Sequence, residues 1–342
     1  MHPGPLLSIR DLVVDFPSPH GRLTVVDGVS LDVGRRELVC VVGESGSGKS
    51  VTMQAAVGLV QAKGGRVRSG GVTFDGRELV GMPGRALNRI RGSEIGFIFQ
   101  EPMASLNPAY TVGEQIAEVV RRHRGASRRD AWARAVAMLD RVGIATAAAR
   151  ADDYPHQFSG GMRQRVMMAI ALACDPKLLI ADEPTTALDV TIQARILALI
   201  RELQRDLELS VLFITHDLGV VAEIADRVVV MYAAQAVETT PSAELFRTPR
   251  HPYTSGLLEA MPQVALARGR PPVAIPGMVA QPHAWPSGCR FHPRCGFAAK
   301  GICDTAPIPL TPEGPTLVRC VRSAEVQPAL LHLTTERKAT AA

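Results

Sequence analysis

The stretch VVGESGSGKSV, residues 41–51, decides the fold. Gly43, Gly48, Lys49 and Ser50 fit the spacing G-x-x-x-x-G-K-[ST] of a phosphate-binding loop. Glycines have no Cβ, so the backbone can close around a polyphosphate and point successive N–H groups inward. In such a loop the lysine reaches the β- and γ-phosphates, and the serine hydroxyl holds Mg²⁺. The residues expected to contact the nucleotide here are Gly43, Ser45, Gly46, Gly48, Lys49, Ser50 and Val51.

The sequence on either side of this stretch supports the same interpretation. Residues 37–42, ELVCVV, form a short apolar, β-branched run that is typical of a buried strand. A helix beginning near Lys49 would direct the positive end of its dipole at the phosphates. The alternative is a Gly/Ser-rich turn that fits the spacing by chance, and the partner motifs further along the chain argue against it.

Length and composition limit the classes of protein to which this chain can belong. Its 342 residues favour one large ATP-binding domain with an appendage. The net charge of +5 is spread along the chain and aromatic residues make up 4%, so we expect no nucleic-acid partner. No apolar run approaches the roughly 18–20 residues that span a bilayer. The N-terminus lacks the pattern of a secretory signal, which predicts a cytoplasmic protein.

The first part of the chain predicts short strands with a candidate adenine contact. Residues 7–16 and 23–33 alternate as strands do, and residues 17–22 form a loop between them. Phe16 lies just before this loop, where an aromatic ring could stack on an adenine base. The alternative is that Phe16 only packs against the sheet.

A helical block follows the phosphate loop and two further strands. Residues 64–71 are expected to form a Gly-rich turn, 71–75 a strand, and 94–100 a strong strand that ends in Gln100. After a loop at 101–108, residues 111–124 and 127–142 have helical periodicity. Thr111 and Glu114 have the spacing of a capping box, and Gly143 would stop the second helix.

A second candidate anion site lies in YPHQFSGGMRQR, residues 154–165. Ser159 is expected to cap a helix over 162–173, so Ser159, Gly160 and Gly161 would stand at a helix N-terminus. One chain seldom needs two γ-phosphate sites so far apart in sequence. We therefore expect this motif to close over a nucleotide held by another subunit, the alternative being a simple loop-to-helix cap.

Paired acidic residues end the next buried strand, at 177–183. Asp182 would then lie near Mg²⁺, and Glu183 could polarise a water for in-line attack on the γ-phosphate. The alternative is a solvated strand end. A turn at 184–189 delivers Asp189 toward the same site, and residues 210–216 form another buried strand that ends in His216, where a polar ring can hold the γ-phosphate and the water.

With these motifs in their order, residues 6 to about 250 resemble the ATP-binding cassette (ABC) family. The resemblance rests on residues 43–50, Gln100, 158–165, 178–189 and His216. It implies that Ser50, Gln100 and Asp182 surround Mg²⁺, and that Ser159 and Gly161 contact ATP held by a partner cassette. It also implies that Glu183 is the catalytic base, that Asp189 communicates across the dimer and that His216 is the switch histidine.

A narrower resemblance links the chain to the ATPase subunits of dipeptide, oligopeptide and nickel importers. It rests on residues 100–108, 154–162, 250–258 and 288–295. Such subunits work with a second ABC ATPase subunit, a paralogue or a second copy, with two transmembrane permease subunits, and with an extracytoplasmic substrate-binding protein. The resemblance therefore implies a peripheral location at the cytoplasmic face of the cell membrane.

Four cysteines cluster near the C-terminus with the spacing C-x₅-C-x₇-C-x₁₆-C. They are Cys289, Cys295, Cys303 and Cys320. Four thiolates in a Pro-rich segment suit one metal centre, but the spacing lacks the paired C-x₂-C of a zinc ribbon. Four Cys ligands also suit a 4Fe–4S cluster, and the subfamily resemblance implies that cluster. Zinc and unligated thiols remain the alternatives.

The expected fold is α/β, with a P-loop NTPase (RecA-like) core sheet and an antiparallel β subdomain. Residues 1–250 would form the ATP-binding domain, with a helical subdomain at about 101–170, and residues 251–342 an extension with the four-Cys metal site. The expected function is ATP hydrolysis that powers import of di- and oligopeptides. The alternatives are import of nickel or another small solute, a soluble ABC ATPase outside transport, and a regulatory module without turnover. The intact Glu183 and His216 argue against the last of these.

Overall fold

The computed structural model describes residues 4–19, 21–100, 105–186, 188–267, 269 and 271–327. Apolar, β-branched runs of the sequence form its buried strands β3 (Leu38–Val42), β7 (Leu178–Asp182) and β8 (Ser210–Ile214). The predicted loop at 101–108 is thus described only from residue 105, and the tail beyond 327 lies outside the described residues. Backbone contacts divide the chain into two compact units. Unit 1 comprises Met1–Leu6, Val33–Glu37 and Phe74–Ile214; unit 2 comprises Leu7–Asp32, Leu38–Thr73 and Thr215–Ala342.

Unit 1 contains three parallel strands in the order β8-β7-β6. They are β6 (Ile95–Ile98), β7 (Leu178–Asp182) and β8 (Ser210–Ile214). Every residue of β7 and β8 is buried, as their nearly continuous apolar sequence predicts. Asp182 pairs with Ile214 in the register, so the carboxyl ends of β7 and β8 lie at the same edge.

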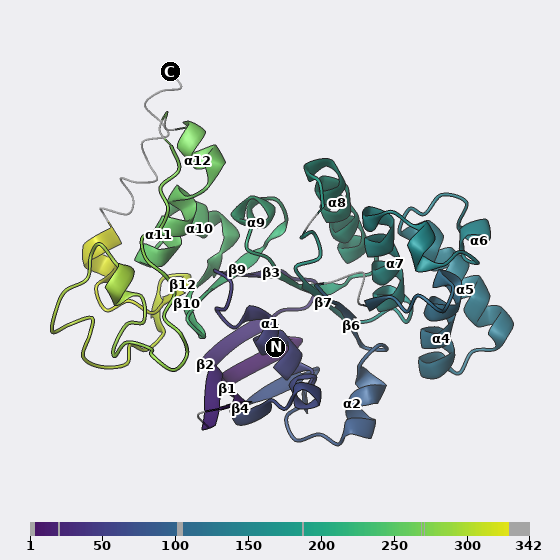
Figure 1. Cartoon of the computed structure of the whole chain (residues 1–342), viewed down its shortest axis with the longest axis horizontal. Coiled ribbons are helices and arrows are strands. Elements are labelled where there is room, and N and C mark those ends of the chain that lie inside the picture. Colours follow the sequence, from purple (N-terminus) through teal and green to yellow (C-terminus); the bar gives the residue numbers. More distant parts are fainter. Residues whose placement is uncertain are drawn as a thin grey trace. The chain divides into compact units, whose positions relative to one another are not determined.

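Helices make up most of the rest of unit 1, and α4, α5, α6 and α7 form one cluster (Figure 1). The Thr111 side chain accepts from Glu114 N at 3.3 Å and caps α4, and Gly125 ends that helix in the left-handed region. The predicted helices over 111–124 and 127–142 are therefore confirmed within a residue or two. The bounds of these helices and of the other elements of the unit are α2 (Gly84–Ile90), α4 (Val112–Arg124), α5 (Arg128–Arg141), α6 (Ala147–Arg150), η2 (Pro155–Gln157), α7 (Gly160–Leu172), α8 (Val190–Asp206) and β5 (Arg77–Glu78).

Five strands of unit 2 pair side by side in the order β11-β12-β10-β9-β3. β3 (Leu38–Val42) runs parallel to β9 (Arg227–Tyr232), and the other neighbours are antiparallel. All five residues of β3 are buried, and the phosphate loop follows its last residue. The remaining strands are β10 (Gln235–Pro241), β11 (Thr311–Glu313) and β12 (Thr316–Val318). Residues of the Cys-rich extension thus complete this part of the sheet.

A second sheet of unit 2 contains β2-β1-β4, and α1 (Lys49–Ala56) lies against it (Figure 1). Its strands are β1 (Leu7–Ser18), β2 (Gly21–Val33) and β4 (Arg66–Phe74). The turn predicted over 64–71 was wrong from Arg66 onward, because β4 begins there. A Cβ at Gly70 would lie 2.5 Å from the Asp11 carbonyl, so this glycine allows a close approach of β1 rather than a turn.

The helices of unit 2 are α1 (Lys49–Ala56), η1 (Val60–Lys63), α9 (Leu218–Ile224), α10 (Ser242–Arg247), α11 (Pro252–Glu259), α12 (Pro262–Ala267) and η3 (His292–Arg294). In the part of the chain that the structure describes, no helix has both the length and the apolar character needed to cross a bilayer.

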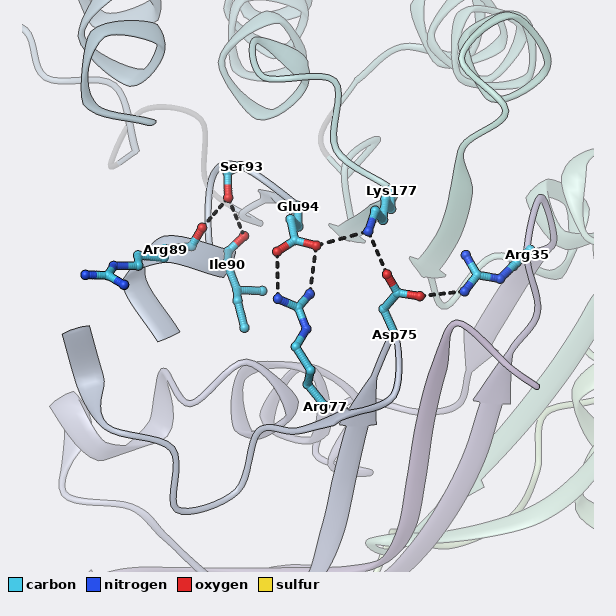
Figure 2. A network of polar contacts seen from close by, with 8 residues as sticks. All are labelled: Arg35, Asp75, Arg77, Arg89, Ile90, Ser93, Glu94 and Lys177. Carbon is cyan, nitrogen blue, oxygen red and sulfur yellow. Dashed lines mark hydrogen bonds and ion pairs between the residues drawn. The ribbon is translucent and has the colours of Figure 1, made fainter. Parts of the chain in front are cut away.

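A chain of ion pairs joins four segments of unit 1 (Figure 2). Lys177 Nζ lies 2.6 Å from Asp75 and 3.2 Å from Glu94. Arg77 makes two hydrogen bonds to Glu94, at 2.9 and 2.7 Å, and Arg35 pairs with Asp75. Hydrogen bonds from Lys177 and Arg35 lower the pKa of Asp75, and hydrogen bonds from Arg77 and Lys177 lower that of Glu94.

We expect Lys177→Met to lower the stability of the chain at neutral pH by about 0.5–1 kcal/mol, because the lysine is half exposed and solvent screens the pair. Both carboxyl pKa values are lowered from 3.8 and 4.5, so this stabilisation is present above those values and is lost as the pH falls through the lowered ones. Melting temperatures from pH 3 to 8 measure it. Glu208→Gln, which removes the exposed Arg36–Glu208 pair, is the control. If the difference in melting temperature between Lys177→Met and wild type were the same at the lowest pH as at neutral pH, the expectation would be contradicted.

Candidate nucleotide site

The phosphate loop begins where β3 ends and passes directly into α1. Gly43 has φ +151°, and a Cβ there would lie 2.1 Å from the Met231 carbonyl. Gly48, the N-cap of α1, has φ +95°, and its Cβ would lie 2.8 Å from the Val25 carbonyl. Both positions therefore require glycine, which agrees with the spacing that predicts the loop.

Lys49 lies inside the loop. Only 5% of the residue is exposed, and its ammonium group donates to the carbonyls of Gly43 at 2.7 Å and Glu44 at 3.0 Å. Ser45 and Gly46 are exposed at the tip, whereas Ser50 and Val51 are half-buried in the first turn of α1. The loop thus presents exposed backbone next to a buried cation, an arrangement suited to phosphate.

Two other predicted residues belong to the same unit as the loop. Thr215 N donates to the Val41 carbonyl at 3.1 Å, which places the exposed His216 at the edge of the sheet where the loop begins. Phe16 is half-buried near the end of β1, and a Cβ at Gly65 would lie 2.7 Å from its ring. Phe16 therefore packs against the backbone at Gly65, and its stacking on adenine stays a prediction.

Glu183 of unit 1 follows the last residue of β7 in a strained conformation. Its φ is +47°, a region that residues other than glycine seldom adopt, and its N–H donates to the Ile214 carbonyl at 3.0 Å. Gln100 Nε2 and Thr186 Oγ1 donate to Glu183 Oε2, at 3.2 and 2.9 Å. These bonds orient the carboxylate. Asp182 beside it is 2% exposed, which fits a buried strand end and not the solvated alternative.

The Ser-Gly-Gly motif and Asp189 cap two helices of unit 1. Ser159 Oγ accepts from Met162 N at 3.4 Å at the start of α7, and Ser159 and Gly160 are exposed. Asp189 Oδ1 accepts from Ile192 N at 2.9 Å at the start of α8. A Cβ at Gly161 would lie 2.7 Å from the Ile192 side chain, so α8 contacts this motif. The predicted cap at Ser159 is confirmed and leaves Ser159 and Gly160 exposed, whereas the cap formed by Asp189 was not predicted.

The four C-terminal cysteines line one cavity of unit 2, together with His251 and Phe291. All four are free and half-buried. Burial raises the pKa of Cys289 and Cys295, and that of Cys320 to about 12; neighbouring cysteines add to each rise. Among the described residues, however, no group of three or more His, Cys, Asp or Glu side chains is placed to hold a single metal ion.

Several contacts of the site could not be found from the sequence. Thr186 is one, because a threonine in a turn carries no signal that it will bond Glu183. Arg290 and Arg294 are the others, and they contact the phosphate loop or the turn behind it from a segment about 250 residues away. The only hint in the sequence is that both stand between Cys289 and Cys295.

Known families and proteins resemble this chain over most of its length. The ABC transporter family matches residues 26–186, the C-terminal region of oligopeptide/dipeptide transporters matches residues 237–303, and an AAA domain matches residues 151–222. Peptide import ATP-binding proteins of Brucella melitensis and Brucella ovis are each 50% identical over 94% of this chain and 98% of their own length.

Solved structures of ATP-binding cassettes resemble this chain as well. A dimeric ATP-binding cassette in a post-hydrolysis state, bound to ADP and Pi, is 27% identical with a TM-score of 0.62, covering 69% of this chain and 98% of that one. A component of an ABC transporter complex from Clostridium perfringens is 26% identical with a TM-score of 0.60, covering 71% and 91%. These matches confirm the α/β, P-loop NTPase fold and the ATPase class. The chain belongs to the ABC transporter ATPases, in the branch that carries the oligopeptide/dipeptide transporter C-terminal region.

Proposed function

We propose that this ATPase powers an importer of di- and oligopeptides. The observation that carries the proposal is the 50% identity, over 94% of the chain, to proteins named for peptide import. The match of residues 237–303 to the C-terminal region of oligopeptide/dipeptide transporters supports the same substrate class. The domain division follows: residues 1–250 hydrolyse ATP, and residues 251–342 form the extension that marks this branch.

The phosphate loop, Glu183 and His216 supply the chemistry. The backbone of Gly43–Ser50 and the Lys49 ammonium hold the β- and γ-phosphates. Glu183 accepts a proton from the attacking water, and its carboxylate is already oriented by Gln100 and Thr186. His216 holds the γ-phosphate and that water. Phosphoryl transfer of this kind depends mainly on positioning and charge stabilisation.

Mg²⁺ fits the oxygen donors that these motifs offer. Ser50 supplies a hydroxyl, Asp182 a carboxylate and Gln100 an amide, and magnesium prefers oxygen ligands. Gln100 uses its amide nitrogen to bond Glu183, so its amide oxygen is the atom left to bind the cation. A Mg²⁺ ion held by these residues would neutralise charge that develops on the phosphates.

Other protein subunits complete the proposed importer. The Ser159–Gly161 motif, in which Ser159 and Gly160 are exposed, contacts the γ-phosphate of an ATP held by a second ABC ATPase subunit, a paralogue or another copy, and Asp189 carries the signal across the dimer. Gly160 contributes a backbone N–H at the same helix terminus. Phe16 stacks on the adenine. Two permease subunits and an extracytoplasmic substrate-binding protein deliver the solute, and the chain binds the cytoplasmic face of the membrane peripherally. No nucleic acid takes part.

The four cysteines hold a 4Fe–4S cluster in this proposal, and two observations support it. The four thiols line one cavity, and the neighbouring cysteines add to the rise in the pKa of Cys320. His251 lines the same cavity and is 1% exposed, so a buried imidazole belongs to the same site as the four thiols. When bound, the cluster links segments that have little core of their own.

Iron content tests this assignment. Protein purified without oxygen should be brown and hold about four iron and four sulfide ions per chain. We expect Cys303→Ser to remove most of the iron, because one of the four ligands is lost. Cys174→Ala, which changes a buried cysteine of unit 1, should leave the iron in place. Colourless protein with background iron would rule out the cluster, and stoichiometric zinc without sulfide would establish the zinc alternative.

Substrate class is tested by uptake in cells that lack this chain. Labelled di- and oligopeptides should enter slowly, and the wild-type gene should restore their uptake, whereas uptake of free amino acids should not change. Normal peptide uptake with impaired nickel uptake would instead establish the nickel alternative. Normal uptake of every solute tested would favour an ABC ATPase outside transport.

A further inference from the structure

Arg294, which directly precedes Cys295, makes a two-fold contact with the phosphate loop. Its Nη1 lies 2.8 Å from Glu44 Oε2, and its Nη2 lies 3.1 Å from Glu44 Oε1. Glu44 is the residue after the first glycine of the loop. The arginine side chain is 7% exposed, so little solvent screens this pair.

The surroundings of Arg294 fix its guanidinium group. It donates to the carbonyls of Pro276 and Ile275, at 2.8 and 3.3 Å, and to Tyr232 Oη at 3.3 Å. Burial lowers the pKa of Arg294, but the hydrogen bonds to Glu44 and Tyr232 outweigh burial and raise it. The main chain of the loop is held from the same side, because Glu44 N donates to Tyr253 Oη at 2.9 Å.

Arg290, which directly follows Cys289, contacts the turn behind the loop. It donates to the Ala233 carbonyl at 2.5 Å and pairs with Asp27. Ala233 and Ala234 form the turn between β9 and β10, both with positive φ. Ala234 N then donates to the carbonyl of Ser47 in the loop at 3.1 Å. Arg290 thus supports the loop through one intervening turn.

We propose that the Cys289–Cys295 segment positions the phosphate loop for nucleotide binding, chiefly through the Arg294–Glu44 pair. This inference rests on the proposed role of the loop in binding ATP. A loop with several glycines has many conformations to lose when it closes on phosphate, and fixed anchors reduce that entropic cost.

The test is a double-mutant cycle on the full chain, read by the Kd of a fluorescent ATP analogue. Arg294→Gln and Glu44→Gln should each weaken binding about ten-fold, since each removes a charge-assisted pair. The double variant should be no weaker than either single one, because both changes remove one interaction. The maximal hydrolysis rate at saturating ATP should change less than KM. Arg247→Ala, which removes an exposed Arg–Glu pair of unit 2 that does not involve the loop, should bind as wild type does.

The outcomes separate this inference from the proposed function. Additive losses, or wild-type Kd values for both single variants, would overturn the role of the Arg294–Glu44 pair. If Arg294→Gln does not fold, Glu44→Gln with wild-type affinity overturns it alone. Lys49→Ala serves as the reference: if it too binds the analogue as wild type does, the nucleotide role of the loop is wrong, and the inference falls with it.

Discussion

Glutamine in place of Glu183 is expected to lower the rate of ATP hydrolysis by about 10²- to 10⁴-fold, the range over which a positioned general base acts. The amide keeps the shape of the carboxylate but cannot accept the proton of the attacking water. ATP binding should persist, because phosphate contacts come from the loop and not from Glu183. Phosphate release at saturating ATP measures the rate, and equilibrium binding of ATP measures the affinity.

The matched control for this prediction is Glu208→Gln, which changes an exposed glutamate of unit 1 that pairs with Arg36 at the surface. It should hydrolyse ATP at the wild-type rate. Glu183 has a positive φ and bonds Gln100 and Thr186, so the fold of the variant needs a check by circular dichroism. A folded Glu183→Gln protein that hydrolysed ATP normally would show that another residue is the base.

Alanine in place of Lys49 is expected to weaken ATP binding by about 100-fold, because the loss of a buried cation that pairs with phosphate typically costs 2–5 kcal/mol. The ammonium group is buried inside the loop and bonds two of its carbonyls. The loss should be larger for ATP than for AMP, since Lys49 is assigned to the β- and γ-phosphates. Isothermal titration with both nucleotides measures the difference.

Lys63→Ala controls for the general loss of positive charge near the loop. Lys63 ends η1 of the same unit, and its ammonium bonds Gln54 at 3.3 Å on an exposed surface. Its removal should leave both affinities unchanged. Equal losses for ATP and AMP in Lys49→Ala would indicate that the lysine only supports the loop.

Short motifs made much of this site predictable. The loop at residues 43–50 needs glycine at particular backbone positions and lysine beside them, so a short local sequence pattern is enough to predict it. Asp182 and Glu183 were predicted as site residues because a buried strand that ends in carboxylates is energetically costly unless they serve a function. Helix caps at Thr111 and Ser159 were predicted for a similar local reason, and the structure confirms both.

Contacts between distant segments could not be predicted in this way. The Arg294–Glu44 pair joins residues 250 positions apart, and no local pattern relates them. β11 and β12 have three residues each, too few to show a periodicity, and they form because β10 offers an edge to pair with. The strand β4 was hidden by its glycines, which suggest a turn until the close approach of β1 at Gly70 is known.

Peptide uptake that depends on hydrolysis at Glu183 tests the central claim most directly. Cells lacking this chain would be supplied with wild-type, Glu183→Gln or Glu208→Gln protein at equal levels, and entry of a labelled oligopeptide would be measured. We predict that wild type and Glu208→Gln restore uptake and that Glu183→Gln does not. Full uptake with Glu183→Gln would contradict the claim that hydrolysis by this residue drives import.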